Sequence, residues 1–393
     1  MDATFDQEQE MLAQTAGRMA DALGPSSVHD LESYDPSKAA DELIRSGMLG
    51  LALPERLGGS GATCVEVAIV AEALARRLVP VPYVGPVTAL ELLAAAGQDE
   101  LVSDVVAGDR VVTLGLDTGL EGIAEADAAL VAWEAAGATH AVTRVGADGS
   151  WAPTLRSLQA ASDVDCVDLT RRLRRLAPSG NTPGGTDLAG TDLAGTDLAG
   201  TDPAGTDPAG ATPAGTTSMP AGGLRPDQIA RWEAFALSLL CADMVGAMDG
   251  ALALAVEHAR WRVQFGRPIG SFQALQHICA EQLVDLEASR SATYHSAWAV
   301  GGLPADQAVR AARVAKSYVS RAGRSVTETV LQVLGGIGQT WESLAHVYLR
   351  RVLLDRVTLG DETVHVARLG ASLVNMASGD GTDGGYGGLQ SAR

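Results

Sequence analysis

A cluster of turn-forming and polar residues breaks the most strongly helical part of this sequence. The stretch 226–265 carries helix-forming residues almost without interruption, and it reads as one very long helix or as two helices in line. It runs into RWRVQFGRPIGSFQALQH, residues 260–277, which contains a Gln-Phe-Gly turn, a proline and a second glutamine. A new helical pattern follows directly, so we expect a tight turn between two long helices.

The apolar spacing beyond this turn predicts more helices. FQALQHICAEQLVDLEASR repeats apolar residues as a helical stripe, and further helices are predicted to begin at Pro304 and Thr340. DETVHVARLGASLVNM is predicted to form the last helix. Because helices joined by short loops pack antiparallel, residues 225–377 are predicted to form a C-terminal helical bundle.

The preceding residues predict two smaller units. Residues 1–108 read as an all-α domain of four to six helices, in which Thr63 and Glu66 form a capping box. Residues 109–178 contain short β-branched runs bounded by Gly or Asp, such as DRVVTLGLD and THAVTRV, which are typical of strands. The predicted fold class is therefore α+β and mostly α: a helical domain, a small middle β domain and an antiparallel bundle.

A five-residue repeat separates the β domain from the bundle. Residues 179–224 repeat Thr-Asp-Leu/Pro-Ala-Gly, which offers too little apolar surface to offset the entropy of ordering, so we interpret them as a flexible insert. Their spaced aspartates also suit a calcium-binding repeat, although β-rolls of that kind use longer repeats. The tail 378–393 is rich in glycine and is predicted to be disordered.

Charge and composition limit the classes of function. The formal net charge of -19 argues against a nucleic-acid surface, because phosphate contacts need clustered Lys and Arg. The four cysteines form no C-x-x-C pair, the histidines show no metal-ligand spacing, and the N-terminus lacks a secretion-signal pattern. No apolar run reaches the roughly 18 residues that cross a bilayer. We expect a reduced, cytoplasmic protein without a metal site or a membrane span.

Four motifs resemble the acyl-CoA dehydrogenase family. They are RVQFGRPIGSFQALQH, then LQVLGGIGQTWE (331–342) followed by HVYLRR (346–351), then LALPERLGGSG with AEALAR, and finally DLTRRLRRL. The resemblance covers the chain except the repeat, and the first two motifs together are quite specific. It implies an FAD-dependent enzyme that desaturates a CoA thioester between its α and β carbons, with electron-transfer flavoprotein as the acceptor.

The resemblance also implies which residues hold FAD. Arg262 would pair with the diphosphate across a subunit boundary, as a planar guanidinium does well. Glycines in GGIG would let the backbone approach phosphate oxygens. Simpler roles stay open: Arg262 as a cation at a helix C-terminus, the glycines as an inter-helix loop, and Phe265 and Phe272 as core residues. The cofactor-binding residues so implied are Arg262, Gln264, Phe265, Gln273, Gln332, Gly335, Gly336 and Gly338.

The catalytic base of the family is missing. The family places a glutamate at one of two positions, which here are Ala236 and Gly360, and neither residue carries a carboxylate. A shifted Asp361 or Glu362 could replace it, Asp243 could supply it from an apolar helical stretch, or a partner subunit could provide it. We favour the partner.

A second departure from the family pattern points the same way. The middle domain of the family carries a Thr-Glu-Pro…Gly-Ser-Asp segment against the flavin ring, whereas this chain has LGLDTGLEGIAEAD. The resemblance is therefore to the glutamate-lacking subunit of actinobacterial steroid side-chain enzymes, which implies a paralogous partner in an α2β2 heteromer and a bulky acyl-CoA substrate. Two rival hypotheses are a flavin-dependent monooxygenase of the same fold and a non-catalytic scaffold subunit.

Overall fold

The computed structural model describes residues 5–146, 151–179 and 223–377. The predictions for the repeat and the tail therefore fall outside the described residues, except at the two ends of the repeat. Both ends are held by main-chain hydrogen bonds: the Ser179 N–H donates to the Asp127 carbonyl, in the turn before the second strand of the sheet, and the Leu224 N–H donates to the Trp151 carbonyl.

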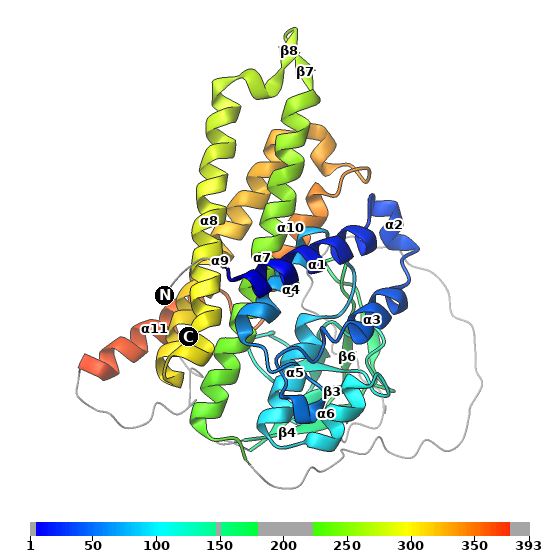
Figure 1. Ribbon diagram of the computed structural model, residues 1–393, viewed down its shortest axis with the longest axis vertical. Helices are drawn as coiled ribbons and strands as arrows, with labels where there is room; N and C mark the ends of the chain where they lie inside the picture. Colours follow the sequence, from blue (N-terminus) through cyan, green and yellow to red (C-terminus); the bar gives the residue numbers. More distant parts are fainter. Residues whose placement is uncertain (1–4, 147–150, 180–222, 378–393) are drawn as a thin grey trace, which may run out of the picture.

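Three long helices form the tall part of the molecule (Figure 1). They are α7 (Pro226–Trp261), α8 (Gln273–Gly302) and α9 (Ala305–Leu334), followed by η3 (Gly335–Gln339), α10 (Ala345–Val357) and α11 (Glu362–Ala377). The stretch before the turn is thus one 36-residue helix. Pro226 occupies its first turn, where a missing N–H costs nothing, and its side chains are buried on nearly every side.

Helix α7 is apolar because it lies in the core of the fold. Against the prediction, this helix is long and apolar enough to cross a membrane, but 78% of its most apolar window is buried within the fold. Close packing on α4 requires two of its glycines. A Cβ at Gly246 would lie 2.1 Å from the Glu72 carbonyl oxygen, and one at Gly250 would lie 2.3 Å from that of Arg76. Helix α7 is therefore a core helix pressed against the N-terminal helices.

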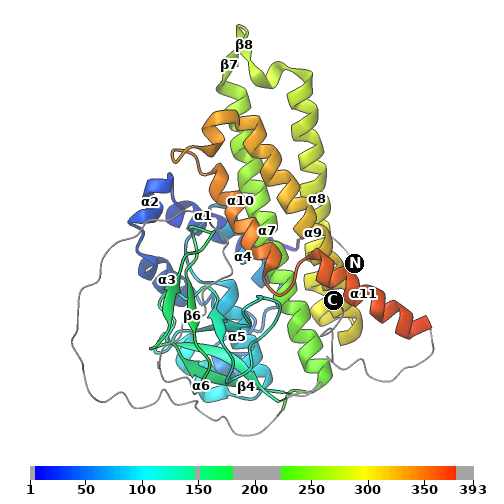
Figure 2. The same cartoon turned by 180° about the vertical axis from the view of Figure 1, so that it is seen from behind.

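The N-terminal helices cover the lower half of α7 and one side of the sheet (Figures 1 and 2). The Thr63 capping box is confirmed, because its hydroxyl accepts from the Val65 N–H and Glu66 accepts from the Thr63 N–H. The helices are α1 (Gln7–Leu23), α2 (Val28–Glu32), α3 (Pro36–Arg45), η1 (Glu55–Leu57), α4 (Cys64–Arg76), α5 (Val84–Ala95) and α6 (Asp99–Val106).

A six-stranded sheet forms the middle part, in the order β4-β3-β1-β2-β6-β5. Strands β1 and β3 run parallel, and the other neighbours run antiparallel. The sequence patterns missed β4, which contains Pro153; it lies at the edge of the sheet, where a proline removes no ladder hydrogen bond. The bounds are β1 (Val112–Leu116), β2 (Leu130–Ala132), β3 (His140–Val145), β4 (Ala152–Ser157), β5 (Ser162–Val164) and β6 (Leu173–Leu176).

One predicted helix start is wrong. The prediction places a helix cap at Thr340, but α10 begins five residues later, after Leu344. The Thr340 hydroxyl instead donates to the Ile337 carbonyl at 2.9 Å and closes the preceding turn. The observed order, helical domain then sheet then helical bundle, confirms the predicted fold class.

Candidate functional site

The turn between α7 and α8 is a small hairpin at the tip of the molecule. Its strands are β7 (Val263–Gln264) and β8 (Arg267–Pro268). Phe265 and Gly266 form the turn with φ of 53° and 76°, the left-handed values that a tight hairpin turn needs. Such a φ is unusual for phenylalanine, and this side chain is 92% exposed. Phe265 is therefore no core residue of this chain.

Arg262 stands at the base of the hairpin. It ends α7 as the C-cap residue, and its side chain is exposed. Its guanidinium makes no hydrogen bond or ion pair with any described residue. Arg267, in contrast, lies over the Phe272 ring at 4.1 Å. Arg262 is thus free to bind an anion, although its place at a helix C-terminus also suits the helix dipole.

The glycine loop lies between α9 and α10. Gly335 adopts φ 65° and ψ −141°, a conformation almost confined to glycine. A Cβ at Gly336 would meet no atom within 4 Å, so the backbone there is open to a ligand. Gly338 has a packing role, since a Cβ there would lie 3.0 Å from the Leu334 Cβ. The plain loop interpretation therefore fits Gly338 better than it fits Gly335 and Gly336.

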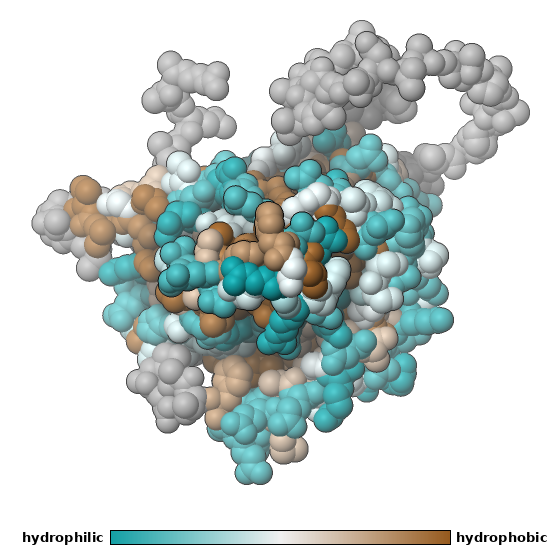
Figure 3. All heavy atoms as spheres, turned by 90° about the horizontal axis from the view of Figure 1, so that it is seen from above, coloured by the Kyte–Doolittle hydropathy of each residue, from teal (hydrophilic) through white to brown (hydrophobic). Residues whose placement is uncertain are grey.

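Both views place the hairpin and the glycine loop at the same end of the bundle (Figures 1 and 2). Seen from that end, apolar side chains gather at the centre of the face, among hydrophilic ones (Figure 3). Gln264, Gln273 and Gln332 are exposed here as well. No hydrogen bond or ion pair in the described chain joins Arg262 to the loop. The exposed large apolar residues of this end are Trp261, Val263, Phe265, Ile337 and Trp341.

The two base positions lie in the packed interior. Ala236 is fully buried in α7. Gly360 is also buried and has φ +98°; a Cβ there would lie 3.1 Å from Val364 Cγ1 and 3.3 Å from His365 Nε2. A larger side chain at 360 would be strained by the backbone conformation and crowded by its neighbours.

The neighbouring carboxylates already have partners. Glu362 accepts three guanidinium hydrogen bonds from Arg356, at 2.6, 2.8 and 3.1 Å. Burial opposes ionisation of Glu362, but these hydrogen bonds lower its pKa. Asp361 accepts the Thr363 N–H at 2.9 Å, at the start of α11. Both side chains therefore hold the α10–α11 loop, and neither is positioned as a free base.

The two departures from the family pattern meet in space. The Leu359 N–H, beside Gly360, donates to the Leu120 carbonyl at 2.7 Å. Leu120 belongs to LGLDTGLEGIAEAD, and both leucines have left-handed φ values, 60° for Leu120 and 58° for Leu359. The segment expected to carry the flavin-ring motif and the loop expected to carry the base are therefore neighbours in the fold.

Two buried basic side chains, which sequence patterns did not reveal, lie beside this loop. Lys316 is fully buried and donates to the Asp355 and Arg356 carbonyls at the end of α10, at 2.7 and 2.9 Å. Burial lowers its pKa to about 8. His365 is fully buried, and neither ring nitrogen has a partner among the described residues. Burial, together with Lys316, lowers the pKa of His365 to about 3, so the imidazole is neutral.

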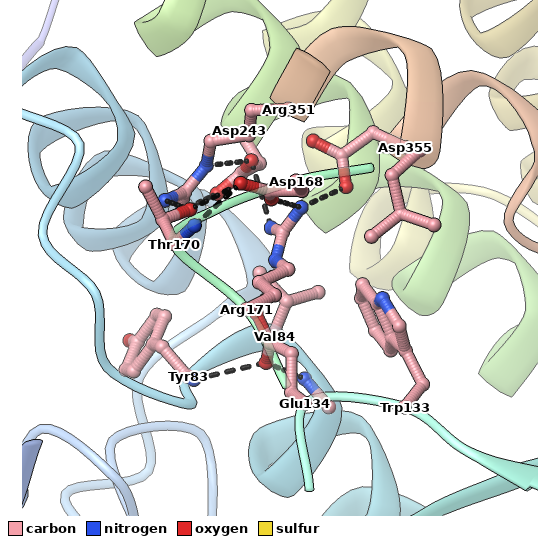
Figure 4. Close-up of polar contacts among 12 residues, drawn as sticks. Tyr83, Val84, Trp133, Glu134, Asp168, Thr170, Arg171, Asp243, Arg351 and Asp355 are labelled. Atoms are coloured by element: carbon pink, nitrogen blue, oxygen red, sulfur yellow. Dashed lines mark hydrogen bonds and ion pairs between the residues drawn. The ribbon is translucent and has the colours of Figure 1, made fainter. Parts of the chain in front are cut away.

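Asp243 belongs to a buried network of charged side chains (Figure 4). Arg351 donates to its two oxygens at 2.7 and 2.8 Å, and Arg171 donates to it at 2.9 Å. Burial alone would raise the pKa of Asp243, but the two arginines lower it well below the ordinary value. A carboxylate paired in this way is a poor proton acceptor, so Asp243 is a structural residue.

The network joins all three parts of the chain. Arg171, beside β6, also donates to Glu134 at 2.8 Å and to Asp355 of α10. Glu134 in turn accepts the N–H groups of Tyr83 and Gly85 in the N-terminal domain, at 3.0 and 2.7 Å. Burial and the charge of Asp243 raise the pKa of Asp355 above its ordinary value. A charged residue within an apolar run, such as Asp243 in LLCADMVGAM, is the sequence pattern that could have indicated this buried network.

Family models match both helical parts of the chain. The acyl-CoA dehydrogenase N-terminal domain matches residues 6–107, and the C-terminal domain matches residues 238–374. Together with the fold, these matches define an oxidoreductase that acts on acyl-CoA thioesters. The chain belongs to the acyl-CoA dehydrogenase family. Members of this family depend on FAD.

Individual relatives agree with this assignment. Acyl-CoA dehydrogenase IpdE2 of Mycobacterium tuberculosis is 31% identical over 359 residues, which cover 88% of this chain and 92% of the relative. One chain of the ChsE4–ChsE5 complex from Mycobacterium tuberculosis superimposes with a TM-score of 0.74 at 24% identity, covering 95% of this chain and 99% of that chain. A variant of the Tcur3481–Tcur3483 steroid ACAD gives 0.77 at 22% identity, with the same coverage. The two structures show the shared fold.

We expect Asp243→Asn to lower the free energy of unfolding by about 3–5 kcal/mol, because it leaves buried arginines without their anion. The lowered pKa means that the wild-type contribution is present above the unfolded value of 3.8 and is lost as pH falls below it. The difference between variant and wild type, measured by urea unfolding, should therefore shrink below pH 4. Asp21→Asn, which removes the exposed Asp21–Arg77 pair, is the control and should cost under about 1 kcal/mol. Equal losses would contradict the structural role.

His365 gives a second pH-dependent prediction. Its folded-state pKa lies below the unfolded value of 6.5, so the unfolded chain binds the proton first and stability falls as pH decreases from 7 toward 3. Protonation of this histidine in the unfolded chain should lower the free energy of unfolding by about 2 kcal/mol between pH 7 and pH 5. His365→Phe should make the melting temperature less dependent on pH over that range, whereas His29→Phe on the surface of α2 should leave the pH dependence unchanged. An unchanged slope in His365→Phe would show that the imidazole is not held neutral.

Proposed function

We propose that this chain is a subunit of an FAD-dependent acyl-CoA dehydrogenase, that it binds the FAD diphosphate, and that a paralogous partner supplies the catalytic base. One combined observation carries the proposal. An unpaired, exposed guanidinium and a bare glycine backbone lie at the same end of the bundle, while both base positions are buried without a carboxylate. The chain has kept surface chemistry for an anion and has lost the chemistry for proton removal.

The residues at the hairpin end fit a dinucleotide. Arg262 would neutralise diphosphate charge, and the open backbone at Gly335 and Gly336 allows phosphate oxygens a close approach. Phe265, held outward in a strained conformation, would contribute an apolar contact outside its own chain. Bound FAD would supply the acceptor for the hydride that leaves the β carbon of the thioester. The exposed Gln264, Gln273 and Gln332 would add hydrogen bonds to the same group.

The partner would complete the chemistry. Removal of the α proton needs a carboxylate of raised pKa, and the loop at Gly360 holds instead a neutral imidazole and a buried lysine. Similar solved structures include a ChsE4–ChsE5 complex and a Tcur3481–Tcur3483 steroid ACAD, which supports a paralogous partner and a bulky ring-bearing acyl group. We propose an α2β2 heteromer. Electron-transfer flavoprotein would reoxidise the flavin. The four free cysteines suit a cytoplasmic enzyme.

Arg262→Gln tests the cofactor half of this proposal. In the assembled complex we expect flavin retained after gel filtration, read from its visible absorbance, to fall at least tenfold, because the diphosphate loses a charge-assisted pair. Arg260→Gln is the matched control: it removes the same charge from an exposed arginine at the same end of α7. Full occupancy in Arg262→Gln, with the complex intact, would place the cofactor elsewhere.

A second experiment tests the missing base. The purified chain alone should show under about 1% of the acyl-CoA-dependent dye reduction seen after co-expression with a glutamate-bearing paralogue, since removing general acid–base catalysis costs 10²–10⁴-fold. Replacing the partner's glutamate with glutamine should abolish the activity of the complex. Full turnover by the lone chain would contradict the division of roles. Oxygen uptake that depends on a separate flavin reductase would favour the monooxygenase.

A further inference from the structure

Trp341 follows the glycine loop at the hairpin end of the bundle, and 43% of its surface is exposed. It is not among the residues that the resemblance assigns to FAD. Two hydrogen-bonded turns fold this segment: the Thr340 N–H donates to the Ile337 carbonyl at 3.2 Å, and the Ser343 N–H donates to the Thr340 carbonyl at 3.1 Å. A turn of this kind brings its ends within about 7 Å, so the indole stays close to the open backbone at Gly336.

The indole of Trp341 is held by residues of two different parts of the chain. One face stacks on the His346 ring, with the ring centroids 5.4 Å apart and the planes at 23°. The indole N–H donates to Glu32 at 3.2 Å. Glu32 ends the N-terminal helix α2, which both views place beside the connection between α9 and α10 (Figures 1 and 2). Because Glu32 is exposed, this bond adds little to stability, and its main effect is to limit rotation of the indole.

His346 supports the indole from the side of the bundle. It is buried, and neither of its ring nitrogens has a hydrogen-bond partner among the described residues. Burial, together with the charge of Arg350, lowers the pKa of His346 below its ordinary value, so the ring is uncharged at neutral pH. Two neutral rings pack well in an offset stack, which leaves the other face of the indole available. Trp341 is therefore a flat surface with a fixed orientation.

Two other exposed aromatic residues of this end are less suited to a flat ligand. Trp261 is 57% exposed and meets the His258 ring at 81°. Phe265 is 92% exposed and meets the Phe272 ring at 83°. Both belong to the α7–α8 connection, and each meets its neighbour at nearly a right angle. Trp341 instead belongs to the connection that carries the glycine loop, and a second ring backs one of its faces.

We propose that the adenine ring of bound FAD stacks on the outer face of Trp341. The inference rests on the proposed binding of FAD and names the residue that would hold its adenine end. Stacking on an aromatic side chain suits a nucleobase, because every base presents a flat π-face. In FAD one ribose separates adenine from the diphosphate. A platform a few residues beyond the open backbone at Gly335 and Gly336 therefore lies where the base of a loop-bound diphosphate would reach it.

Adenine occurs in CoA as well, so the charges around Trp341 have to distinguish the two sources. The adenosine of CoA carries a 3′-phosphate, which that of FAD lacks. Glu32 accepts from the indole, and Glu342 follows Trp341 directly in the chain; both carboxylate side chains are exposed. A 3′-phosphate beside this indole would meet like charge, which disfavours CoA here. The surroundings of Trp341 therefore favour the adenosine of FAD.

Trp341→Leu tests the platform in the complex with the paralogous partner. After removal of bound flavin, we expect the dissociation constant for FAD to rise about tenfold, because one base–aromatic stack is lost. The dissociation constant for FMN, which has no adenine, should not change. Trp261→Leu is the matched control, since it removes the other exposed indole of this end, and Trp341→Phe should keep most of the affinity for FAD. Unchanged FAD binding in Trp341→Leu, or equal losses for FAD and FMN, would overturn the proposal.

Fluorescence separates the two sources of adenine. ADP should quench tryptophan emission in the wild-type complex, and the quenching should be lost in Trp341→Phe. Adenosine 3′,5′-bisphosphate, the adenine end of CoA, should quench less at the same concentration. Stronger quenching by the bisphosphate, with a raised KM for acyl-CoA in Trp341→Leu, would assign the indole to CoA and overturn the proposal. If Arg262→Gln lowers retained flavin and Trp341→Leu does not, the platform alone fails; if neither variant does, FAD binding at this end fails with it.

Discussion

The buried network around Arg171 sets the arrangement of everything else. A guanidinium in the interior is tolerated when its charge is fully paired, and the partners of Arg171 come from separate parts of the chain: Glu134 from the loop after β2, and Asp243 and Asp355 from the bundle. Glu134 carries the connection on to the N-terminal domain. Arg171 has all of these partners only when the three parts of the chain are in contact, so the network fixes their relative positions and holds the Leu120–Leu359 contact in register.

Local sequence patterns predicted most of the helices and strands, but they could not predict which buried charged residues pair with one another. The Thr63 capping box and the helical stripes depend on residues a few positions apart, so the sequence was sufficient. Strand β4 was missed because Pro153 conceals an edge strand. The partners of Arg171 lie up to 184 residues away, and no periodicity links them. The exposure of Phe265 was equally unpredictable, since an aromatic residue in a turn is compatible with a core or a surface position.

In the candidate site, too, local features could be predicted from the sequence and long-range contacts could not. Motif resemblance identified the segments that the structure places at one end of the bundle, because turn and glycine chemistry is local. The residues that surround Gly360 could not be predicted from the sequence, because Lys316 is 44 positions away along the chain and His365 has the pattern of an ordinary helical residue. A neutral imidazole and a lysine bound to main-chain carbonyls lie beside Gly360, one of the two positions at which the resemblance leads us to expect a glutamate.

The attachment of the repeat has a consequence for how its length can change. Main-chain hydrogen bonds hold Ser179 to Asp127, in the turn before β2, and Leu224 to Trp151, beside β4. The described part of the chain is therefore fixed on either side of the Thr-Asp-Leu/Pro-Ala-Gly units. Closing a chain between two points costs only about 0.6 kcal/mol more for each doubling of the number of residues between them. A change in the number of five-residue units would therefore alter the free energy of folding little and would leave both hydrogen bonds in place.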